Sequence, residues 1–343
     1  MRIIPWLLIS FLIGLIFPDA AFPWGVEGHR AVAKLASWYV SPETLKKVNE
    51  LLAASGERDL PSISTWADDL RLAARDEGPL RGNMEALAFN RDFPTNASWH
   101  FVNLPLGSES YESVRNFGSK DDVVHAIMCC VTVLESLNPL PGRMTRIQAL
   151  RFLVHLVGDI HQPLHCGCGF YNLTDPKAPQ LISDPKMAFG QPNDRGGNDL
   201  FYNLKNNQEL HAFWDTIVVT AIADTLDYKG LAAYLERHHR MSEVPLTPGS
   251  YKVWAERWAI DSVKCATQAY AGIRFGHLDR LQIKGQSGLP SYYQLSMLKI
   301  RSELLFSNCL PRLFIWRNSW TVSSGPELAL GYKFPPTGEG LLG

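Results

Sequence analysis

One segment, residues 144–162 (MTRIQALRFLVHLVGDIHQ), constrains the fold more than any other part of the chain. Its apolar residues recur at the spacing of a helix, and Pro163 predicts where that helix ends. His155 and Asp159 lie four positions apart in this pattern, so both side chains project from one face of the helix. Burying an imidazole and a carboxylate is costly unless the two groups pair or bind a metal ion. The segment therefore predicts a buried helix that carries a polar site.

Helical spacing dominates the rest of the chain as well. It runs through residues 29–54, 120–137, 208–241 and 251–271, and the first of these is divided at Ser41-Pro42, a cap followed by a proline. Strand-like alternation is scarce: residues 201–204 (FYNL), after the turn DRGGN, are the best candidate for a hairpin arm. Residues 166–197 are rich in glycine, proline, asparagine and aspartate and predict a long loop. We therefore predict an all-α fold, a single mainly helical domain with a small β-hairpin.

Composition excludes two classes of protein. Hydrophobic residues make up 46% of the chain and charged residues 20%, which excludes a disordered polymer. The 33 lysines and arginines balance 34 acidic residues, so a basic surface of the repressor or histone type is not expected. Any affinity for phosphate must therefore arise at a local site.

The first 23 residues have the pattern of a targeting segment. Arg2 precedes an apolar run over residues 3–17, and two alanines follow shortly after it. This arrangement is typical of a secretory signal peptide, and the run is shorter than the ~20 residues that a membrane span needs. We expect residues 1–23 to be removed and the protein to be secreted or periplasmic.

The cysteines are too sparse for a disulfide scaffold, although an exported chain can form disulfide bonds. There are six of them, Cys129, Cys130, Cys166, Cys168, Cys265 and Cys309, and the sequence leaves their pairing open. Cys166 and Cys168 are separated by one residue, which is the wrong spacing for a CxxC metal or redox pair. Disulfide bonds are therefore expected, but not a thiolate metal site.

A second pair of polar residues repeats the arrangement of the central helix. His211 and Asp215 lie four positions apart in LHAFWD, and His165 follows directly after the proline that ends the central helix. One buried pair is explained at least as well by a hydrogen bond between its members, but two pairs with an additional histidine favour metal binding. Neutral imidazole nitrogens and carboxylate oxygens suit Zn²⁺.

Three upstream segments carry further candidate residues. They are WGVEGH, with Trp24 and His29; WADDLR, with Asp68 and Arg71; and WHF, with His100 and Phe101. Taken singly, each is better explained by packing or by surface exposure than by chemistry. Their meaning depends on whether they occur together.

Together these motifs resemble the S1/P1-type zinc-dependent nucleases and, at greater distance, the bacterial zinc phospholipases C. The motifs are WGxxGH, WADxxR, WHF, FLxHxxGDxHQPLH, DxGGN and LHxxWD, in the order of the family. The resemblance covers residues 24–306, which we expect to form a nuclease domain with the phospholipase C/P1 nuclease-like fold. Residues 307–343 lack the family's closing helix and are expected to be a divergent C-terminal tail.

The resemblance implies three zinc ions per chain. The first would be bound by Asp68, His100, His155 and Asp159, the second by Asp159, His29 and the amino nitrogen and carbonyl oxygen of Trp24, and the third by His165, His211 and Asp215. Asp159 would therefore bridge two ions. The other histidines match no ligand position; they are His125, His161, His238, His239 and His277.

The resemblance also implies roles in catalysis and substrate binding. Asp68, Arg71 and Asp159 are expected to be catalytic, with Arg71 stabilising the transition state; a salt bridge to a neighbouring aspartate explains Arg71 equally well. Phe101 matches the family's base-stacking residue, with a core position as the alternative. Asn103 stands where fungal relatives often place an aspartate that reads a base edge, so base preference stays open.

The implied function is that of a secreted endonuclease that cleaves single-stranded DNA and RNA to 5′-phosphorylated products. 3′-Nucleotides would be further substrates, and the protein is expected to be a monomer without a stable protein partner or a membrane span. A zinc phospholipase C and an inactive secreted binding protein of the same fold are the alternatives. The spacing from Trp24 to His29, the aspartate at Asp215 and the aromatic Phe101 argue against the phospholipase. The complete ligand set argues against the inactive protein.

Overall fold

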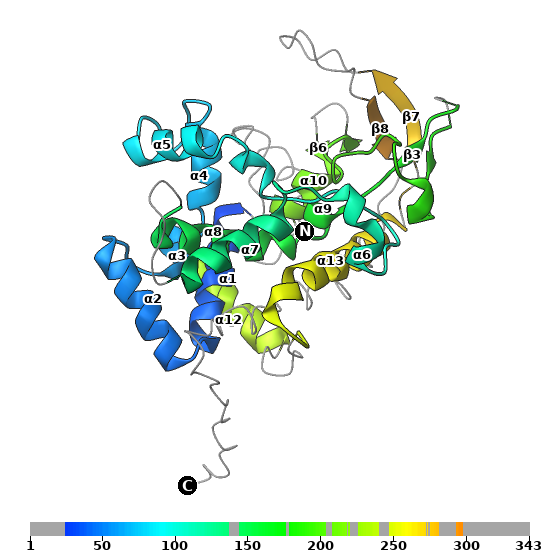
Figure 1. Ribbon diagram of the computed structural model, residues 1–343. Coiled ribbons are helices and arrows are strands. Elements are labelled where there is room, and N and C mark those ends of the chain that lie inside the picture. The colour runs from blue at the N-terminus through cyan, green and yellow to red at the C-terminus, as the bar shows by residue number, and fades with distance from the viewer. Residues whose placement is uncertain are drawn as a thin grey trace, which may run out of the picture.

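The computed structural model describes residues 25–136, 144–175, 178–203, 208–217, 219, 226–239, 247–271, 273, 275–280 and 293–297 (Figure 1). Predictions about Trp24, the signal peptide and the tail after residue 306 lie outside the described residues. Helices dominate the part that is described, and the prediction of a mainly helical fold is confirmed. No helix in these ranges is both long and apolar enough to cross a membrane.

Six longer helices and several short ones make up the helical part. The longer ones are α1 (Gly25–Tyr39), α2 (Pro42–Ala54), α7 (Val123–Glu135), α8 (Arg146–Ile160), α12 (Tyr228–His239) and α13 (Trp254–Tyr270). The shorter ones are α3 (Leu60–Ile63), α4 (Trp66–Ala73), α5 (Met84–Asp92), α6 (Tyr111–Val114), α9 (Pro163–Cys166) and α10 (Leu210–Ala212). Short 3-10 segments lie at Asn96–Ser98, Arg115–Phe117, Pro185–Met187 and Tyr251–Val253.

Helix α8 lies at the centre of the helical part, where α7 runs beside it and α1, α3, α4 and α13 pack on it (Figure 1). Every residue from Ala149 to Ile160 is buried, because this helix is surrounded on all sides. Thr145 and Gln148 start α8 with a capping box, in which each side chain accepts a hydrogen bond from the backbone of the other. The predicted central helix is therefore confirmed, and His155 and Asp159 lie in its buried part.

The helix boundaries follow local signals in the sequence. Ser41 caps α2 and Pro42 occupies its first turn, as the sequence predicts. Pro163 does not only end the central helix, because it also begins the short helix α9. His165 therefore lies in a different helix from Asp159, although it follows it by only six residues.

The helical spacing over residues 208–241 does not correspond to one continuous helix in the described part of the chain. Strand β6 (Gln208–Glu209) and helix α10 are followed by a π-helical turn, Phe213–Ile217, and α12 starts afresh at Tyr228. The carboxylate of Asp227 accepts a hydrogen bond from the backbone N–H of Gly230 at 2.8 Å and so helps to start α12. Local capping and the hairpin thus divide a segment whose apolar residues recur at helical spacing throughout.

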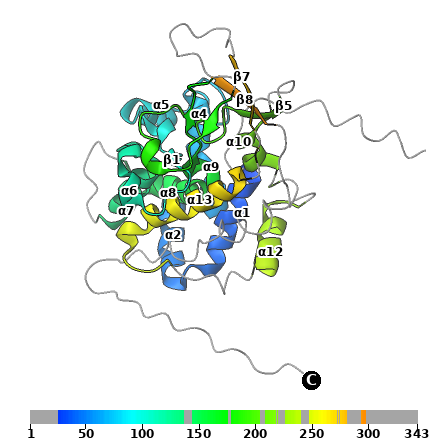
Figure 2. The ribbon, with the colours of Figure 1, turned by 90° about the vertical axis from the view of Figure 1, so that its right-hand side faces the viewer.

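The β structure is larger than the predicted hairpin. Strand β5 (Leu200–Asn203) pairs antiparallel with β6, which confirms the hairpin arm. Strand β5 also pairs in parallel with β8 (Tyr293–Met297), and β8 pairs antiparallel with β7 (Phe275–Arg280), giving the order β6-β5-β8-β7. Figure 2 shows β7 and β8 at the top of the molecule, next to β5. The strands of this sheet come from distant segments, so local alternation along the chain does not indicate it.

Short strand pairs hold the predicted loop 166–197. Strand β1 (Leu104–Pro105) pairs in parallel with β2 (Gly167–Cys168), which joins the segment after His100 to the segment after His165. Strand β3 (Tyr171–Asn172) pairs with β4 (Gln180–Leu181) inside the loop. Among the described cysteines, no two are joined by a disulfide bond, and Cys309 lies outside the described residues.

Candidate metal centre

The two polar residues of α8 lie at the centre of the site. His155 and Asp159 have no solvent exposure, and the Nε2 atom of His155 is 3.0 Å from Oδ2 of Asp159. The same oxygen is 2.9 Å from Nδ1 of His100. The other oxygen, Oδ1, is 3.4 Å from Nε2 of His29 and 3.6 Å from Nδ1 of His165. The two oxygens of Asp159 therefore face different sets of histidines.

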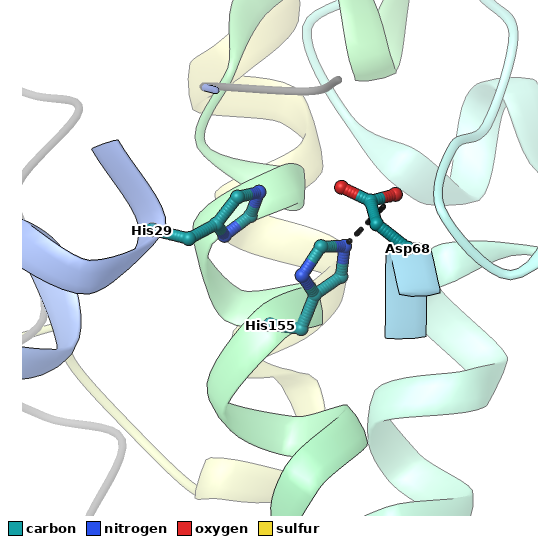
Figure 3. A group of neighbouring side chains, drawn as sticks. All are labelled: His29, Asp68 and His155. Carbon is teal, nitrogen blue, oxygen red and sulfur yellow. Dashed lines mark ion pairs between the residues drawn. The ribbon is translucent and has the colours of Figure 1, made fainter. Parts of the chain in front are cut away.

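One group of candidate ligands joins α1, α4 and α8 (Figure 3). His29, Asp68 and His155 each offer one ligand atom, and these atoms lie within 4.8 Å of one another. The ring of His29 stacks on that of His155 with 4.0 Å between centroids, and Nε2 of His155 is 3.7 Å from Oδ1 of Asp68. The structure thus brings His29 to Asp68 and His155 as well as to Asp159.

A second group surrounds Oδ2 of Asp159. His100, His155 and Asp159 meet the same distance condition, and Nδ1 of His100 is 3.1 Å from Nε2 of His155. Asp68 belongs to this neighbourhood too, because its Oδ1 is 3.7 Å from Nδ1 of His100. His155 is therefore shared by both groups, which lie side by side on α8.

A third group lies where α9 meets the π-helical turn. His165, His211 and Asp215 lie within the same distance of one another, and Nε2 of His211 is 3.3 Å from Oδ2 of Asp215. Nε2 of His165 is 3.8 Å from Oδ1 of Asp215. His211 and Asp215 are four residues apart, and their side chains lie close together across α10 and the π-helical turn, as the same spacing predicts for an α-helix.

Backbone carbonyls hold three of the rings in place. The Nδ1 atom of His155 is 2.8 Å from the oxygen of Ser64, that of His165 is 2.8 Å from the oxygen of His100, and that of His211 is 2.7 Å from the oxygen of Gly196. An imidazole whose Nδ1–H donates to a carbonyl presents the lone pair of Nε2, which is how histidines are oriented in metal sites.

Several buried polar atoms of the site have no hydrogen-bond partner. In the described part of the chain, these include Nε2 of His29, Nε2 of His165 and Oδ1 of Asp159. A buried acceptor without a partner costs about 1–3 kcal/mol, so three in one place are unfavourable unless another group binds them. Their donor set of imidazole nitrogen and carboxylate oxygen fits Zn²⁺.

Burial and the two carboxylates set the proton affinities of the site. Burial lowers the pKa of His29 and of His100, and it lowers the pKa of His165 to about 3. Burial also acts to lower the pKa of His155, but Asp159 and Asp68 outweigh it and raise the pKa to about 9. A metal ion that binds His155 must therefore displace a proton from it.

The residues expected to act on substrate are all at least partly exposed to solvent. The guanidinium of Arg71 is 3.4 Å from Oδ1 of Asp68, with 29% of its side chain exposed, so the predicted salt bridge is present. Phe101 is 39% exposed, which excludes the alternative that it is a core residue. Asn103 is half-buried two residues further on.

His161 and His125 lie outside the three groups. His161 is buried, its Nδ1 is 2.7 Å from the oxygen of Val157, and its ring packs beside Trp258. The Nδ1 of His125 is 2.9 Å from the carboxylate of Asp122. His238 and His239 end α12, and His277 lies in β7.

Asp194 is a buried supporting residue that the sequence analysis placed in a turn and in the motif DxGGN, without a role in the site. Its carboxylate accepts hydrogen bonds from the hydroxyls of Tyr171 at 2.7 Å and Tyr270 at 3.0 Å, and from the backbone N–H groups of Gly169 and Gly197 at 3.1 Å each. Burial raises its pKa. Asp194 thus holds the loop that contains Gly196, and the carbonyl of Gly196 contacts His211.

Gly158 is a second supporting residue, and it lies in the last turn of α8. A Cβ atom at this position would lie 2.9 Å from Nδ1 of His29, closer than real Cβ atoms approach another heavy atom. Glycine therefore lets the ring from α1 approach the backbone of α8. The sequence shows this glycine between two ligand candidates, but its contact needs the position of α1.

Comparison with known proteins gives the class to which this site belongs. The model of the S1/P1 nuclease family matches residues 24–306, so the chain belongs to the S1/P1 nuclease family, and the resemblance seen in the sequence is confirmed.

Individual relatives come from plants and fungi. Endonuclease 4 of Arabidopsis thaliana is 27% identical over 229 residues, covering 64% of this chain and 62% of the relative. Endonuclease 2 of the same plant is 30% identical over 215 residues, covering 59% and 58%. Nuclease P1 of Penicillium citrinum is 34% identical over 142 residues, covering 41% and 47%. The matches to the plant relatives thus span about three-fifths of their length.

Proposed function

We propose that this chain is a zinc-dependent endonuclease that hydrolyses phosphodiester bonds of single-stranded DNA and RNA. Its products would carry 5′-phosphates, and it would also act on 3′-nucleotides. Family membership supports the reaction class, and relatives named as endonucleases support the mode of cleavage. The observation that carries the proposal is the position of Asp159, whose two buried oxygens face different histidines on either side.

The described residues could hold two neighbouring ions around Asp159 and one further ion at the third group. Asp159 would contribute one oxygen to each of two neighbouring ions, with His29 on one side and His100 on the other. His165, His211 and Asp215 would hold a third. When bound, the zinc ions supply Lewis acidity and positive charge for attack on a phosphodiester. Three Zn²⁺ with three aspartate ligands leave a local charge of about +3, so phosphate can bind although the protein is nearly neutral.

Arg71 and Phe101 would act on the substrate. The Arg71 guanidinium is held by Asp68 and has exposed surface, so it can donate to a phosphate oxygen in the transition state. The exposed ring of Phe101 offers a stacking surface worth ~1–3 kcal/mol per base, and only an unpaired base can use it. Preference for single strands would follow from this ring, and Asn103 would contact a base edge.

The mature N-terminus would complete the second ion site. Trp24 can bind through its amino nitrogen only if that amine is terminal, so cleavage or trimming must end between Pro23 and Trp24. Helix α1 starts at Gly25, and a Cβ atom added at this glycine would lie 3.8 Å from the backbone oxygen of Asp215. The start of α1 is thus near the site. N-terminal sequencing of active secreted protein tests this, and a fully active form that starts at Phe22 would remove Trp24 from the ligand set.

We further propose that the protein is a secreted or periplasmic monomer whose nuclease domain spans residues 24–306. A zinc phospholipase C is the second candidate, because the H-x3-D-x5-H arrangement of His155, Asp159 and His165 is common to both enzyme classes. The spacing from Trp24 to His29, the aspartate at Asp215 and the aromatic Phe101 favour the nuclease. A binding protein without activity would not need three buried ligand groups.

A comparison of three substrates tests the proposed function. Purified protein would be assayed on single-stranded DNA, a 3′-mononucleotide and a phosphatidylcholine emulsion, with and without a zinc chelator. We expect chelator-sensitive cleavage of the first two substrates only. Hydrolysis of phosphatidylcholine alone would support the phospholipase instead, and no hydrolysis by the zinc-loaded protein would support the inactive binding protein.

A further inference from the structure

Gln162 is a fully buried residue between the central helix and the short helix α9. It is not a candidate ligand, yet one end of its amide group contacts Asp215 of the third group and the other end contacts the turn that carries His165. The Oε1 atom accepts a hydrogen bond from the backbone N–H of Leu164, which caps the turn that carries His165. The Nε2 atom donates to Oδ1 of Asp215 at 2.7 Å.

This one side chain therefore connects two ligands that come from distant parts of the sequence. His165 follows the capped turn, and Asp215 lies 53 residues beyond Gln162. Both hydrogen bonds are buried, where they are not weakened by competition with water. A single amide group thus joins the turn that carries His165 to Asp215.

The chemistry of the contact requires an amide. A carboxylate accepts hydrogen bonds only, so the partner of Asp215 must donate, whereas the partner of the Leu164 N–H must accept. Glutamine supplies both functions without charge. A glutamate would place a second negative group against Asp215, and a methionine of similar length would supply no donor.

We propose that Gln162 is a positioning residue for the third metal centre, an inference that rests on the zinc-dependent function proposed above. By binding Oδ1 of Asp215, Gln162 turns Oδ2 toward His211, whose Nε2 lies 3.3 Å away. The ion would then be held by His165, His211 and one oxygen of Asp215. Three protein ligands leave a coordination position open for substrate, as in catalytic zinc sites.

Gln148 offers a matched control at the other end of α8. Its Oε1 accepts from the backbone N–H of Thr145 at 2.9 Å, and its Nε2 donates to the carboxylate of Glu85 at 3.0 Å. The hydrogen-bond pattern is the same as at Gln162, a capped helix start joined to a carboxylate. None of these partners belongs to a ligand group.

The test compares four variants, Gln162→Met, Gln162→Glu, Gln148→Met and Gln148→Glu. Zinc per chain would be measured by elemental analysis after dialysis against increasing concentrations of a chelator. Loss of an outer contact of this kind typically weakens metal binding 10–100-fold. We therefore expect both Gln162 variants to lose one ion at a chelator concentration at least tenfold lower than wild type, and both Gln148 variants to match wild type.

The two substitutions at position 162 separate the donor from the cap. Glutamate keeps an acceptor for the Leu164 N–H but loses the donor to Asp215, whereas methionine loses both. Zinc retention like wild type in Gln162→Glu, with loss in Gln162→Met, would show that only the cap matters and would overturn the inference. Retention in both would also overturn it. Thermal unfolding of the metal-free variants, expected within a few degrees of metal-free wild type, checks that the fold is intact.

The same measurement distinguishes this inference from the proposed function. If wild type retains three ions and the Gln162 variants do so equally well, the positioning role is wrong and the zinc-dependent function stands. If wild type retains no zinc before any chelator is added, the proposed function fails and the role of Gln162 falls with it.

Discussion

His155 and Asp159 lie one turn apart on α8, and the Nε2 atom of the first is 3.0 Å from Oδ2 of the second. Both side chains are completely buried. Oδ1 of Asp159 is 3.4 Å from Nε2 of His29, so the two oxygens of the carboxylate lie close to different nitrogen ligands. The proposed chemistry depends on this placement.

Replacement of Asp159 by alanine should cost more activity than any other single ligand replacement. The two oxygens of this carboxylate lie close to different histidines, so its loss would disturb two ions at once. We expect at least a hundredfold loss of kcat/KM on single-stranded DNA. Asp122→Ala, which removes a carboxylate paired with His125 outside the ligand groups, is the control for loss of a buried aspartate. A variant of Asp159 within tenfold of wild type would show that the bridging role is wrong.

Gly158→Ala should impair the site although alanine favours helices. Alanine stabilises a helix interior by ~1 kcal/mol relative to glycine, so local propensity predicts a gain in stability. The added Cβ would lie 2.9 Å from Nδ1 of His29, and the ring must move. We expect a tenfold or greater loss of activity together with weaker zinc binding.

The control for Gly158 is Gly230→Ala in α12. There the added Cβ meets the flexible side chain of Leu226 at 3.1 Å, away from the ligands. This variant should retain its zinc and its activity. Equal behaviour of the two variants would remove Gly158 from the site.

Phe101→Ala should weaken substrate binding and leave the metal content unchanged. Loss of one stacking contact of ~1–3 kcal/mol corresponds to a roughly 5–150-fold rise in KM for a single-stranded oligonucleotide. The exposed ring makes a large change in stability unexpected. Steady-state kinetics and elemental analysis on the same sample would separate the two effects, and loss of zinc would contradict the stacking role.

Asp194→Asn should destabilise the fold and weaken the third group of ligands. The amide nitrogen would face donors that now bind a carboxylate oxygen, and each unpaired buried donor costs about 1–3 kcal/mol. The loop that carries Gly196 would then hold His211 less firmly. Denaturant unfolding of the metal-free protein measures the first effect, and chelator titration measures the second.

Tyr171→Phe is the milder companion to Asp194→Asn. It removes one of the donors to Asp194, at 2.7 Å, and adds no new group. A smaller loss of stability than in Asp194→Asn is expected. If Asp194→Asn were as stable as wild type, the carboxylate would not be the group that holds this loop.

Much of the site could be predicted because its signals are local. The helix that carries His155 and Asp159 follows from apolar spacing and a proline, and the pair on one face follows from a separation of four residues. His211 and Asp215 repeat that separation, although the structure places them across a short helix and a π-helical turn. Spacing alone predicted the pairs, and the order of the motifs predicted the family.

The features that could not be predicted depend on contacts between distant segments. Asp194 is held by Tyr270, 76 residues further on, and Gln162 by Asp215. The sheet that joins β5 to β8 likewise unites distant segments. Apolar spacing over residues 208–241 indicated helix but not its divisions, because it contains no information about the hairpin partner or the cap at Asp227.

The central claim is that the buried histidines and aspartates bind zinc. Elemental analysis of purified, active, full-length mature protein tests it most directly. We predict close to three zinc ions per chain, with activity lost on chelation and restored by added zinc. Fewer than two ions per chain in a folded, active sample would contradict the account.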